Sequence, residues 1–362
     1  MAHKLILVTF FVLSALLSFA QKKDISVLAY YTGGQNADSF AIEKLTHIIF
    51  SFGHLKGNQL SIDDANDSTM IQKLVSYKSR NPNLKVMLSL GGWGGCATCS
   101  DVFATKKGRK EFARSVKLVN DYFQTDGLDL DWEYPVVRGY PGHKYSLVDK
   151  KNFTALVKQV RKAIGWKNEL SFAAGGSKRF IDSAIQWKPV MKKMDRVNLM
   201  SYDLVGGGAM VTGHHTPLYS GRPNAGSAAY GVEQLIAKGV DKNKIVIGAA
   251  FYGRMFENVK DTLNGLYQHG TFLKTVPRRN FETQLSPDSG FVFHWDSTAH
   301  APYLYNASGN LFFTYDDERS VAEKTKFVID QGLGGIMFWQ LGGDLYKDGL
   351  LDAIYEAKKN NQ

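Results

Sequence analysis

The stretch that decides the fold runs from Asp126 to Glu133 and reads DGLDLDWE. Successive side chains of a β-strand point to opposite faces, so Asp129, Asp131 and Glu133 line one face and the apolar residues between them line the other. Packed acids repel each other and are costly to remove from water, so this face does not serve stability. The alternative, an exposed edge strand, would leave two leucines and Trp132 to supply all the burial. We therefore predict a buried strand whose acids point inward.

Position along this strand separates the roles of the three acids. Glu133 comes last, at the carboxyl end of the strand, where the active sites of barrel enzymes lie. A glutamic acid ordinarily has a pKa of about 4.3, whereas a general acid works best with a pKa close to the operating pH. Partial burial and a neighbouring aspartate would raise the pKa of Glu133, so we predict it as the catalytic acid. Asp129 lies deeper and would hold or share the proton of Asp131.

Apolar, β-branched segments alternate with helix-like segments from Ser26 onward. The expected strands are 27–31, 47–52, 85–90, 127–133, 169–174, 196–202, 244–251 and 335–339. The expected helices are 69–79, 109–123, 149–164, 227–238 and 320–331. Eight alternating units predict an α/β fold, a closed (β/α)8 TIM barrel. An open doubly wound sheet is the alternative, and the absence of a Gly-x-Gly-x-x-Gly turn after the first strand counts against it.

One interval is too long for a single helix. Between Arg254 and Tyr315 the sequence turns to short β-like pieces separated by turn residues. This pattern predicts a small α+β insertion domain at 255–314, before the last strand. The barrel then comprises 21–254 and 315–362, and it ends in a short helix and the polar tail 358–362.

The first twenty residues are predicted to be a signal peptide. Lys4 supplies a positive start, residues 5–17 form an apolar run, and the small-residue site at 18–20 precedes Gln21. The apolar run is too short for a comfortable membrane span, and no later segment approaches that length. We expect cleavage after Ala20 and a secreted, soluble protein with no membrane partner.

The composition indicates a folded protein with a modest basic excess. The 362 residues include 44 Lys and Arg against 34 Asp and Glu, and the net charge is +10. The basic residues are scattered, and small clusters such as 106–110 are typical of a solvated helix face, so we expect no nucleic-acid partner. Aromatic residues make up 12%, which suits a sugar-binding cleft because pyranose C–H faces lie flat on aromatic rings. We expect a monomer.

The two cysteines, Cys96 and Cys99, form a Cys-Ala-Thr-Cys segment. After export a local disulfide that pins a loop is favoured over free thiols. No second pair completes a four-cysteine zinc site, and the adjacent His214 and His215 point in different directions, so we expect no metal. The histidines are expected in a loop near the mouth of a cleft, and no cofactor is expected.

The acidic strand resembles the signature of glycoside hydrolase family 18, the chitinase family, whose pattern is Asp-Gly-x-Asp-x-Asp-x-Glu. Four further motifs resemble the family in the expected order, each at the end of an expected strand: Ser89-Leu90-Gly91-Gly92-Trp93, Met200-Ser201-Tyr202-Asp203, Phe251-Tyr252-Gly253-Arg254 and Met337-Phe338-Trp339-Gln340. The interval after Arg254 is similar to the insertion domain of the deep-cleft branch. The resemblance covers most of the chain beyond the signal peptide.

This resemblance implies a specific mechanism. Glu133 would protonate the glycosidic oxygen as general acid and later act as general base. The substrate's own 2-acetamido oxygen, not a second carboxylate, would attack the anomeric carbon, with retention of configuration. Asp131 would orient the acetamido group with Asp129 behind it, and Tyr202 would hydrogen-bond the acetamido oxygen.

The resemblance also implies the residues that bind chitin or chitooligosaccharides. Trp339 would form the apolar floor of the cleft, and the other expected contacts are Tyr30, Phe52, Trp93, Met200, Asp203, Tyr252 and Arg254. Met200 and Tyr202 share strand parity and can both face the barrel interior. Asp203 has the opposite parity, so its role requires the strand to twist or end there.

Two other functions stay open at this point. An endo-β-N-acetylglucosaminidase acting on N-glycans shares the acidic strand, but commonly lacks the insertion. A non-catalytic chitin-binding lectin of the same fold typically lacks the terminal glutamate, which is present here as Glu133. The chain also departs from the family around Cys96–Cys99 and at Ala250, where many relatives have proline.

Overall fold

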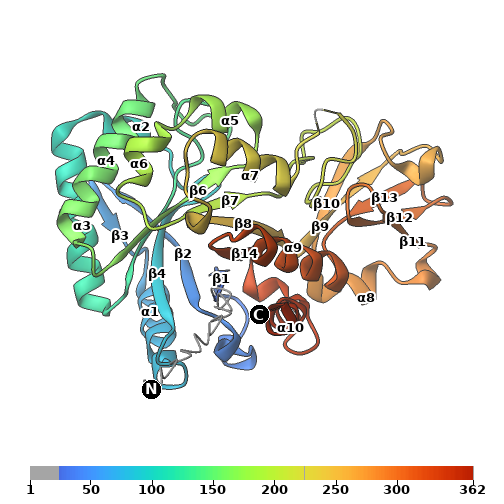
Figure 1. Ribbon diagram of the computed structural model, residues 1–362, viewed down its shortest axis with the longest axis horizontal. Coiled ribbons are helices and arrows are strands. Elements are labelled where there is room, and N and C mark those ends of the chain that lie inside the picture. Colours follow the sequence, from blue (N-terminus) through green and yellow to red (C-terminus); the bar gives the residue numbers. More distant parts are fainter. Residues whose placement is uncertain (1–23, 224, 362) are drawn as a thin grey trace, which may run out of the picture.

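The larger part of the molecule is a closed barrel of eight parallel strands (Figure 1). The computed structural model describes residues 24–223 and 225–361, so the predicted signal peptide lies outside the described residues. Around the barrel the strands are β1 (Ser26–Tyr31), β2 (His47–Lys56), β4 (Lys85–Gly91), β5 (Gly127–Asp131), β6 (Glu169–Gly175), β7 (Val197–Met200), β8 (Ile245–Ala250) and β14 (Gly335–Trp339). Because β1 pairs with both β2 and β14, the barrel is closed and the predicted fold is confirmed. A short strand, β3 (Gln59–Ser61), extends β2 as a hairpin.

Helices surround this barrel: in Figure 1, α3 and α4 lie on the side away from the second sheet, α5 and α7 lie above, and α9 and α10 lie toward the second sheet. They are α1 (Ala65–Ser76), α2 (Cys99–Ala104), α3 (Lys106–Phe123), α4 (Asp149–Ile164), α5 (Lys178–Ser183), α6 (Trp187–Met191), α7 (Ala228–Ala237), α9 (Glu318–Gln331) and α10 (Leu350–Asn361). The five predicted helices are present: 149–164 matches α4 at both ends, and the other four differ from their predictions by a few residues at one end or both. Helices α2, α5 and α6 were not predicted because segments this short carry no helical period. Most of the predicted polar tail is the last turn of α10. Among the described residues, no helix is long and apolar enough to cross a membrane.

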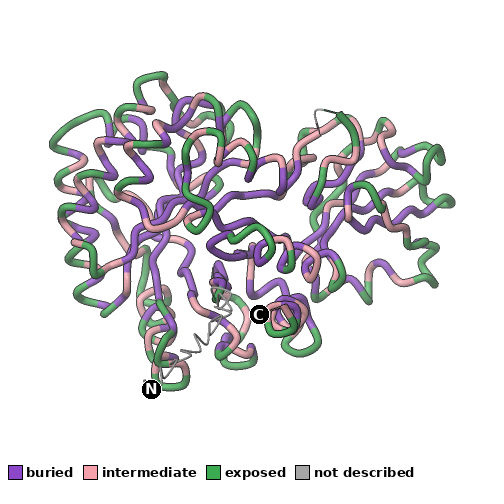
Figure 2. The backbone as a smooth tube through the Cα atoms, in the orientation of Figure 1, coloured by how far each residue is buried: buried purple, intermediate pink, exposed green. Residues whose placement is uncertain are grey.

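The barrel strands are buried on both faces, as Figure 2 shows. Between strands and helices lies a large apolar layer, to which the alternate residues Leu128, Leu130 and Trp132 of the acidic segment contribute. A smaller cluster that includes Met87 and Met200 fills the barrel interior. The alternation predicted for β5 is therefore confirmed, and it directs the acids into the barrel.

A second sheet is inserted between β8 and β14 and lies beside the barrel in Figure 1. Its five antiparallel strands follow the order β10 (Thr271–Pro277), β9 (Tyr252–Glu257), β13 (Leu311–Thr314), β12 (Ala301–Asn306) and β11 (Val292–Asp296). The short helix α8 (Phe281–Gln284) packs against it through the ring of Phe281. The sheet begins at Tyr252, before the predicted insertion boundary at 255.

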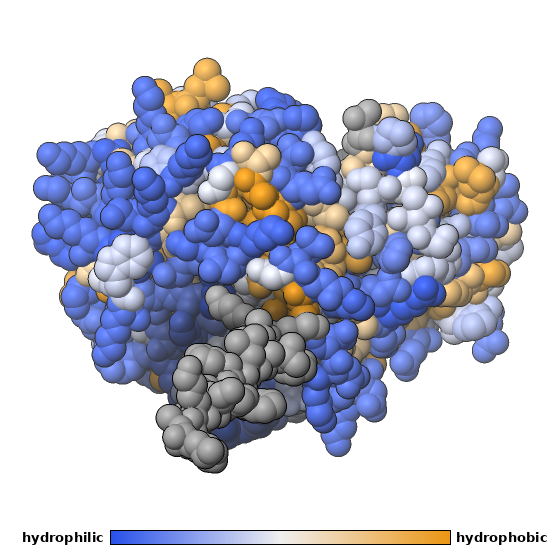
Figure 3. All heavy atoms as spheres, in the orientation of Figure 1, coloured by the Kyte–Doolittle hydropathy of each residue, from blue (hydrophilic) through white to orange (hydrophobic). Residues whose placement is uncertain are grey.

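The face of the molecule drawn in Figure 3 is mostly hydrophilic. Hydrophobic atoms gather near its centre, between the barrel side and the side of the second sheet.

Candidate active site

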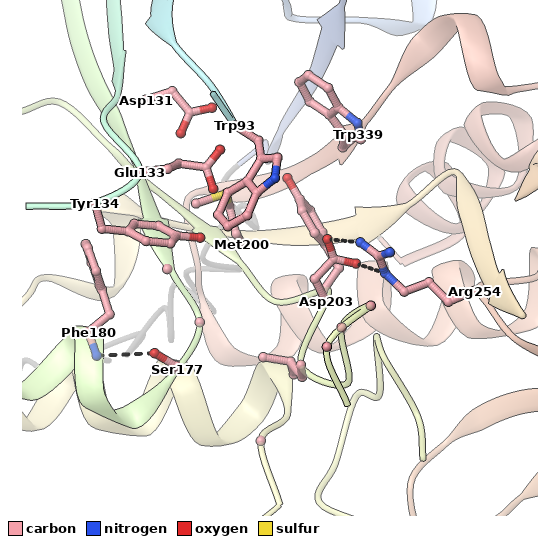
Figure 4. A pocket seen from close by; sticks show the side chains of 18 of the residues that line it. Trp93, Asp131, Glu133, Tyr134, Ser177, Phe180, Met200, Asp203, Arg254 and Trp339 are labelled. Atoms are coloured by element: carbon pink, nitrogen blue, oxygen red, sulfur yellow. Dashed lines mark hydrogen bonds and ion pairs between the residues drawn. The ribbon is translucent and has the colours of Figure 1, made fainter. Parts of the chain in front are cut away.

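A cavity of about 1080 Å³ opens at the carboxyl ends of the barrel strands. Barrel residues and residues of the second sheet line it together, among them Phe52, Trp93, Asp131, Glu133, Tyr134, Met200, Tyr202, Asp203, Tyr252, Arg254, Thr275 and Trp339. In Figure 4, Asp131 and Glu133 project from one side, and Trp339 and the Asp203–Arg254 pair face them from the other. This is the end at which barrel enzymes carry their active sites.

Asp129 lies at the base of the acidic segment and is completely buried. Its carboxylate accepts hydrogen bonds from the Tyr30 hydroxyl (3.0 Å), the Ser89 hydroxyl (3.0 Å), the Ser171 hydroxyl (2.6 Å) and the Asn198 amide (3.1 Å). Four donors can satisfy a buried carboxylate that would otherwise be costly to desolvate. Burial nevertheless leaves the pKa of Asp129 raised.

Asp131 is the next acid along the strand, and it has a different environment. Its Oδ1 atom is buried without a hydrogen-bond partner among the described residues. Burial raises the pKa of Asp131 well above its usual value, and the charges of Glu133 and Asp129 raise it further. The charge of Asp129 is thus one cause of the raised pKa of Asp131, and the sharing of a proton between the two residues stays a prediction.

Glu133 lies two residues beyond the end of β5, with 8% of its surface exposed. Burial raises the pKa of Glu133 to about 7; the Tyr134 hydroxyl lowers it in part, and the charge of Asp203 raises it. A carboxyl group with this pKa carries its proton in an appreciable fraction of molecules at neutral pH. Glu133 can therefore donate a proton into the cavity.

Met200, Tyr202 and Asp203 all line the cavity at the end of β7. The strand stops at Met200, and Asp203 follows with a positive φ of 56°. This confirms that the strand ends before Asp203, so the opposite parity of that residue does not turn it away. The ring of Tyr202 approaches β8 so closely that a Cβ on Gly248 would lie 2.7 Å from it, and only glycine leaves room there.

Asp203 is the centre of a charged cluster that joins the barrel to the second sheet. Arg254 donates to both of its oxygens at 2.5 Å, and the Tyr252 hydroxyl donates at 2.8 Å. Nδ1 of the buried His215 lies 3.5 Å away. Burial alone would raise the pKa of Asp203, but His215 and Arg254 outweigh it and hold the pKa well below its usual range. Asp203 therefore stays ionised while Glu133 is protonated.

The apolar floor of the cavity consists of Trp339 and Phe52. Their rings stack with centroids 5.5 Å apart and an interplanar angle of 19°. Gly92 makes this stack possible, because a Cβ at that position would lie 2.3 Å from the Phe52 ring. Trp93, the next residue, is 58% exposed at the rim.

One predicted contact residue does not face the cavity. Tyr30 is 1% exposed, and its hydroxyl is directed at Asp129 and Asn198 beneath the floor. Its strand parity is right, but it lies too deep in the barrel to reach the cavity. The structure thus assigns Tyr30 to the support of Asp129, which corrects the prediction.

Two residues that support the acids of the site, Asn198 and His215, were not predicted from the sequence. Asn198 shares strand parity with Met200, and this alternation is the one signal that could have revealed it. His215 was expected only as a loop residue, yet it packs 5.2 Å from the Tyr252 ring. Nothing in the local sequence links His215 to Asp203, because the loop brings them together.

A buried ion pair holds the loops behind this cluster. Lys324 on α9 and Asp316 are both completely buried and lie 2.7 Å apart. Asp316 also accepts from the Thr216 hydroxyl and from the backbone of Ala250, at 2.9 Å each. The pair therefore ties the loop that carries His215 to the end of β8, just before Tyr252.

The structure joins Cys96, in the loop that follows Trp93, to Cys99, the first residue of α2, in a disulfide. His214 Nε2 lies 2.9 Å from Asp296 of the second sheet, so the two adjacent histidines point to different partners. No group of three or more His, Cys, Asp or Glu residues suited to a metal ion occurs in the part of the chain that the structure describes.

A parallel barrel with a protonatable glutamic acid, neighbouring aspartates and an aromatic floor has the features of a glycoside hydrolase. The model of Glycosyl hydrolases family 18 matches residues 26–344, and this chain belongs to that family.

Known relatives and a solved structure agree with this membership. The chain is 35% identical over 301 residues to Chitinase A1 of Niallia circulans, which covers 76% of this chain and 43% of that protein. It is 31% identical over 326 residues to Chitotriosidase-1 of Mus musculus, covering 83% of this chain and 68% of that one. A solved family 18 N-acetylglucosaminidase from Paenibacillus barengoltzii is 35% identical with a TM-score of 0.83, covering 92% of this chain and 100% of that chain. The chain thus spans less than half the length of the Niallia relative.

Proposed function

We propose that this protein is a chitinase that hydrolyses β-1,4 bonds between N-acetylglucosamine units by a retaining, substrate-assisted mechanism. The observation that carries the proposal is the combination of a buried Glu133, whose pKa is about 7, with Asp131 and Tyr202 on the same cavity. The family membership and the chitinases among the relatives support the substrate class.

In the proposed first step, Glu133 donates its proton to the glycosidic oxygen as the bond to the anomeric carbon breaks. The carbonyl oxygen of the substrate's 2-acetamido group attacks that carbon from the opposite face and forms a cyclic oxazolinium ion. Asp131 accepts a hydrogen bond from the acetamido N–H and stabilises the positive charge that develops there, and Tyr202 donates to the acetamido oxygen.

In the proposed second step, Glu133, now ionised, takes a proton from a water molecule that attacks the same anomeric carbon. The oxazolinium ring opens, the acetamido group is restored and the product keeps its original configuration. Two displacements at one carbon explain the retention. Burial raises the pKa of Asp131 and so favours its neutral form in the free site, but a positive charge that develops beside it favours the ionised form. Once ionised, its charge stabilises that cation more strongly than it would in water, because the site has a low dielectric constant.

The decisive experiment compares wild-type protein with Glu133→Gln on the N-acetylglucosamine hexamer. We expect Gln to remove the transferable proton and reduce turnover by at least roughly 10²-fold, the low end of what general acid catalysis contributes. Glu356→Gln, an exposed glutamate on α10, is the matched control and should keep full activity. Wild-type turnover by Glu133→Gln, or inversion of configuration detected by NMR, would contradict the mechanism.

Product analysis separates the proposal from its alternatives. Cleavage of the hexamer, but not of a high-mannose glycopeptide, would favour a chitinase over an endo-β-N-acetylglucosaminidase. Release of single sugars alone would place the protein with activities like that of the Paenibacillus neighbour. A lectin would bind the hexamer without any turnover.

We also propose that residues 1–20 direct export, on the basis of their charged start, apolar run and small-residue cleavage site. Expression of the full chain should yield a secreted form that begins at Gln21. N-terminal sequencing of a secreted form that still begins at Met1 would contradict this.

A further inference from the structure

A pair of exposed aromatic residues lies at the rim of the cavity and is not used by the proposed mechanism. Trp93 is 58% exposed and Tyr140 is 39% exposed. Their ring centroids lie 5.6 Å apart, and the ring planes are inclined by 71°. Trp93 lines the cavity that contains Glu133, whereas Tyr140 is not among the residues that line it and contacts Trp93 ring to ring.

The two loops that carry this pair are held in place. A Cβ on Gly94 would lie 3.3 Å from the Tyr140 ring, so the backbone after Trp93 packs closely against that ring. His143, three residues after Tyr140, packs against it from the other end of the turn, with ring centroids 4.9 Å apart and ring planes inclined by 43°. Lys144 then pairs with the Asp101 carboxylate on α2.

Two further contacts fix the same region. Asp149, at the start of α4, accepts hydrogen bonds from Ser100 of α2 at 2.9 and 3.1 Å. The Cys96–Cys99 disulfide closes the loop between Trp93 and α2. The pair is therefore presented on anchored loops, and binding would not need to order it first, a cost that weakens binding to mobile loops.

Another part of the cavity wall has no aromatic side chains. The three glycines at 206–208 line the cavity and offer backbone alone. A Cβ on Gly208 would meet nothing within 4 Å, so the space there is open. The rim at Trp93 and Tyr140 therefore exposes aromatic rings, whereas Gly206–Gly208 expose none.

We propose that Trp93 and Tyr140 form one binding platform for sugar units beyond those held at Glu133, with Tyr140 setting the preference for longer chains. The proposal rests on the proposed function, because it takes the ligand to be a chain of N-acetylglucosamine units. Pyranose C–H faces stack on aromatic rings, and because these two ring planes are inclined by 71°, one flat sugar unit cannot lie on both at once. Tyr140 is a specificity-determining residue and takes no part in bond cleavage.

The test measures binding by calorimetry in the Glu133→Gln background, so that the ligand is not consumed. The probes are the N-acetylglucosamine hexamer and dimer, and Tyr140→Ala is compared with Tyr140→Phe. Tyr122→Ala is the matched control, because Tyr122 is a 74% exposed tyrosine on α3 outside the residues that line the cavity. Circular dichroism and thermal unfolding verify that each variant is folded.

We expect Tyr140→Ala to raise the hexamer Kd roughly fivefold to tenfold, the loss of about one aromatic contact, and to leave the dimer Kd unchanged. Tyr140→Phe keeps the ring and should bind both probes like the parent, as should Tyr122→Ala. An unchanged hexamer Kd, or equal weakening of hexamer and dimer, would overturn the platform. Loss of the proposed function looks different, because wild-type protein would then leave the hexamer uncleaved whatever Tyr140 does.

Discussion

Substitution of Gly92 by alanine tests how the cavity floor is built. Gly92 has a φ of 74°, and a Cβ there would lie 2.3 Å from Cε2 of Phe52. Carbon atoms without a bond between them rest about 3.5–4.0 Å apart, so the ring must move by more than roughly 1 Å. Phe52 stacks on Trp339, and its displacement would therefore shift the floor itself.

The expected cost has two parts. A side chain in the left-handed region costs about 1–2 kcal/mol, and overpacking a well-packed site costs about 1–3 kcal/mol. We therefore expect Gly92→Ala to lower the free energy of unfolding by about 2–5 kcal/mol. Because a misplacement of about 1 Å can cost roughly 10²-fold in rate, kcat/KM should fall by up to that factor.

Urea unfolding and hydrolysis of a fluorogenic chitobioside measure the two effects. Gly332→Ala is the matched control: this glycine ends α9 in the left-handed conformation, with φ 67° and ψ 36°, and a Cβ there meets nothing within 4 Å. It should lose about 1–2 kcal/mol from backbone strain alone and keep full activity. If Gly92→Ala loses no more stability than Gly332→Ala and stays fully active, then neither folding nor activity depends on the close packing of Phe52 against Gly92.

Three further predictions concern charge and support. Because Glu133 acts in its protonated form and burial raises its pKa to about 7, kcat/KM should fall as pH rises above 7, and a flat profile there would contradict its role. Lys324→Met leaves Asp316 buried and unpaired, so urea unfolding should report a loss of about 3–5 kcal/mol; an unchanged midpoint would show that the pair is dispensable. Asn198→Ala removes one of the four hydrogen-bond donors to Asp129, so the free energy of unfolding should fall by about 1–3 kcal/mol and turnover should also fall. If stability and turnover are both unchanged, Asn198 does not support Asp129.

The barrel could be predicted from the sequence because its signals are local. Strand alternation in the segment from Asp126 to Glu133 places apolar residues outward and acids inward, and the structure buries both sets accordingly. The eight strands come as β-branched runs separated by helical periods, and each run lies in a barrel strand. Helices α2, α5 and α6 are too short to show such a period, so they could not be predicted.

The surroundings of the acids were harder to predict because they depend on contacts between distant segments. The donors to Asp129 come from β1, β4, β6 and β7, and only the barrel register brings them together. Tyr30 shows what strand alternation cannot predict. The alternation indicates that its side chain faces the barrel interior, but not how far below the cavity it lies. The contact of His215 with Asp203 likewise depends on how a loop closes.

Strand β9 belongs to two structures at once. It pairs with β10 and β13 inside the second sheet, and it also carries Tyr252 and Arg254, the residues that hold Asp203. The insertion therefore cannot simply be deleted, because any shortened version must still pair β9 with a strand on each side. Loss of those partners would release Arg254 from its carboxylate. Redesign of the side wall therefore has to keep β9 and proceed outward from it.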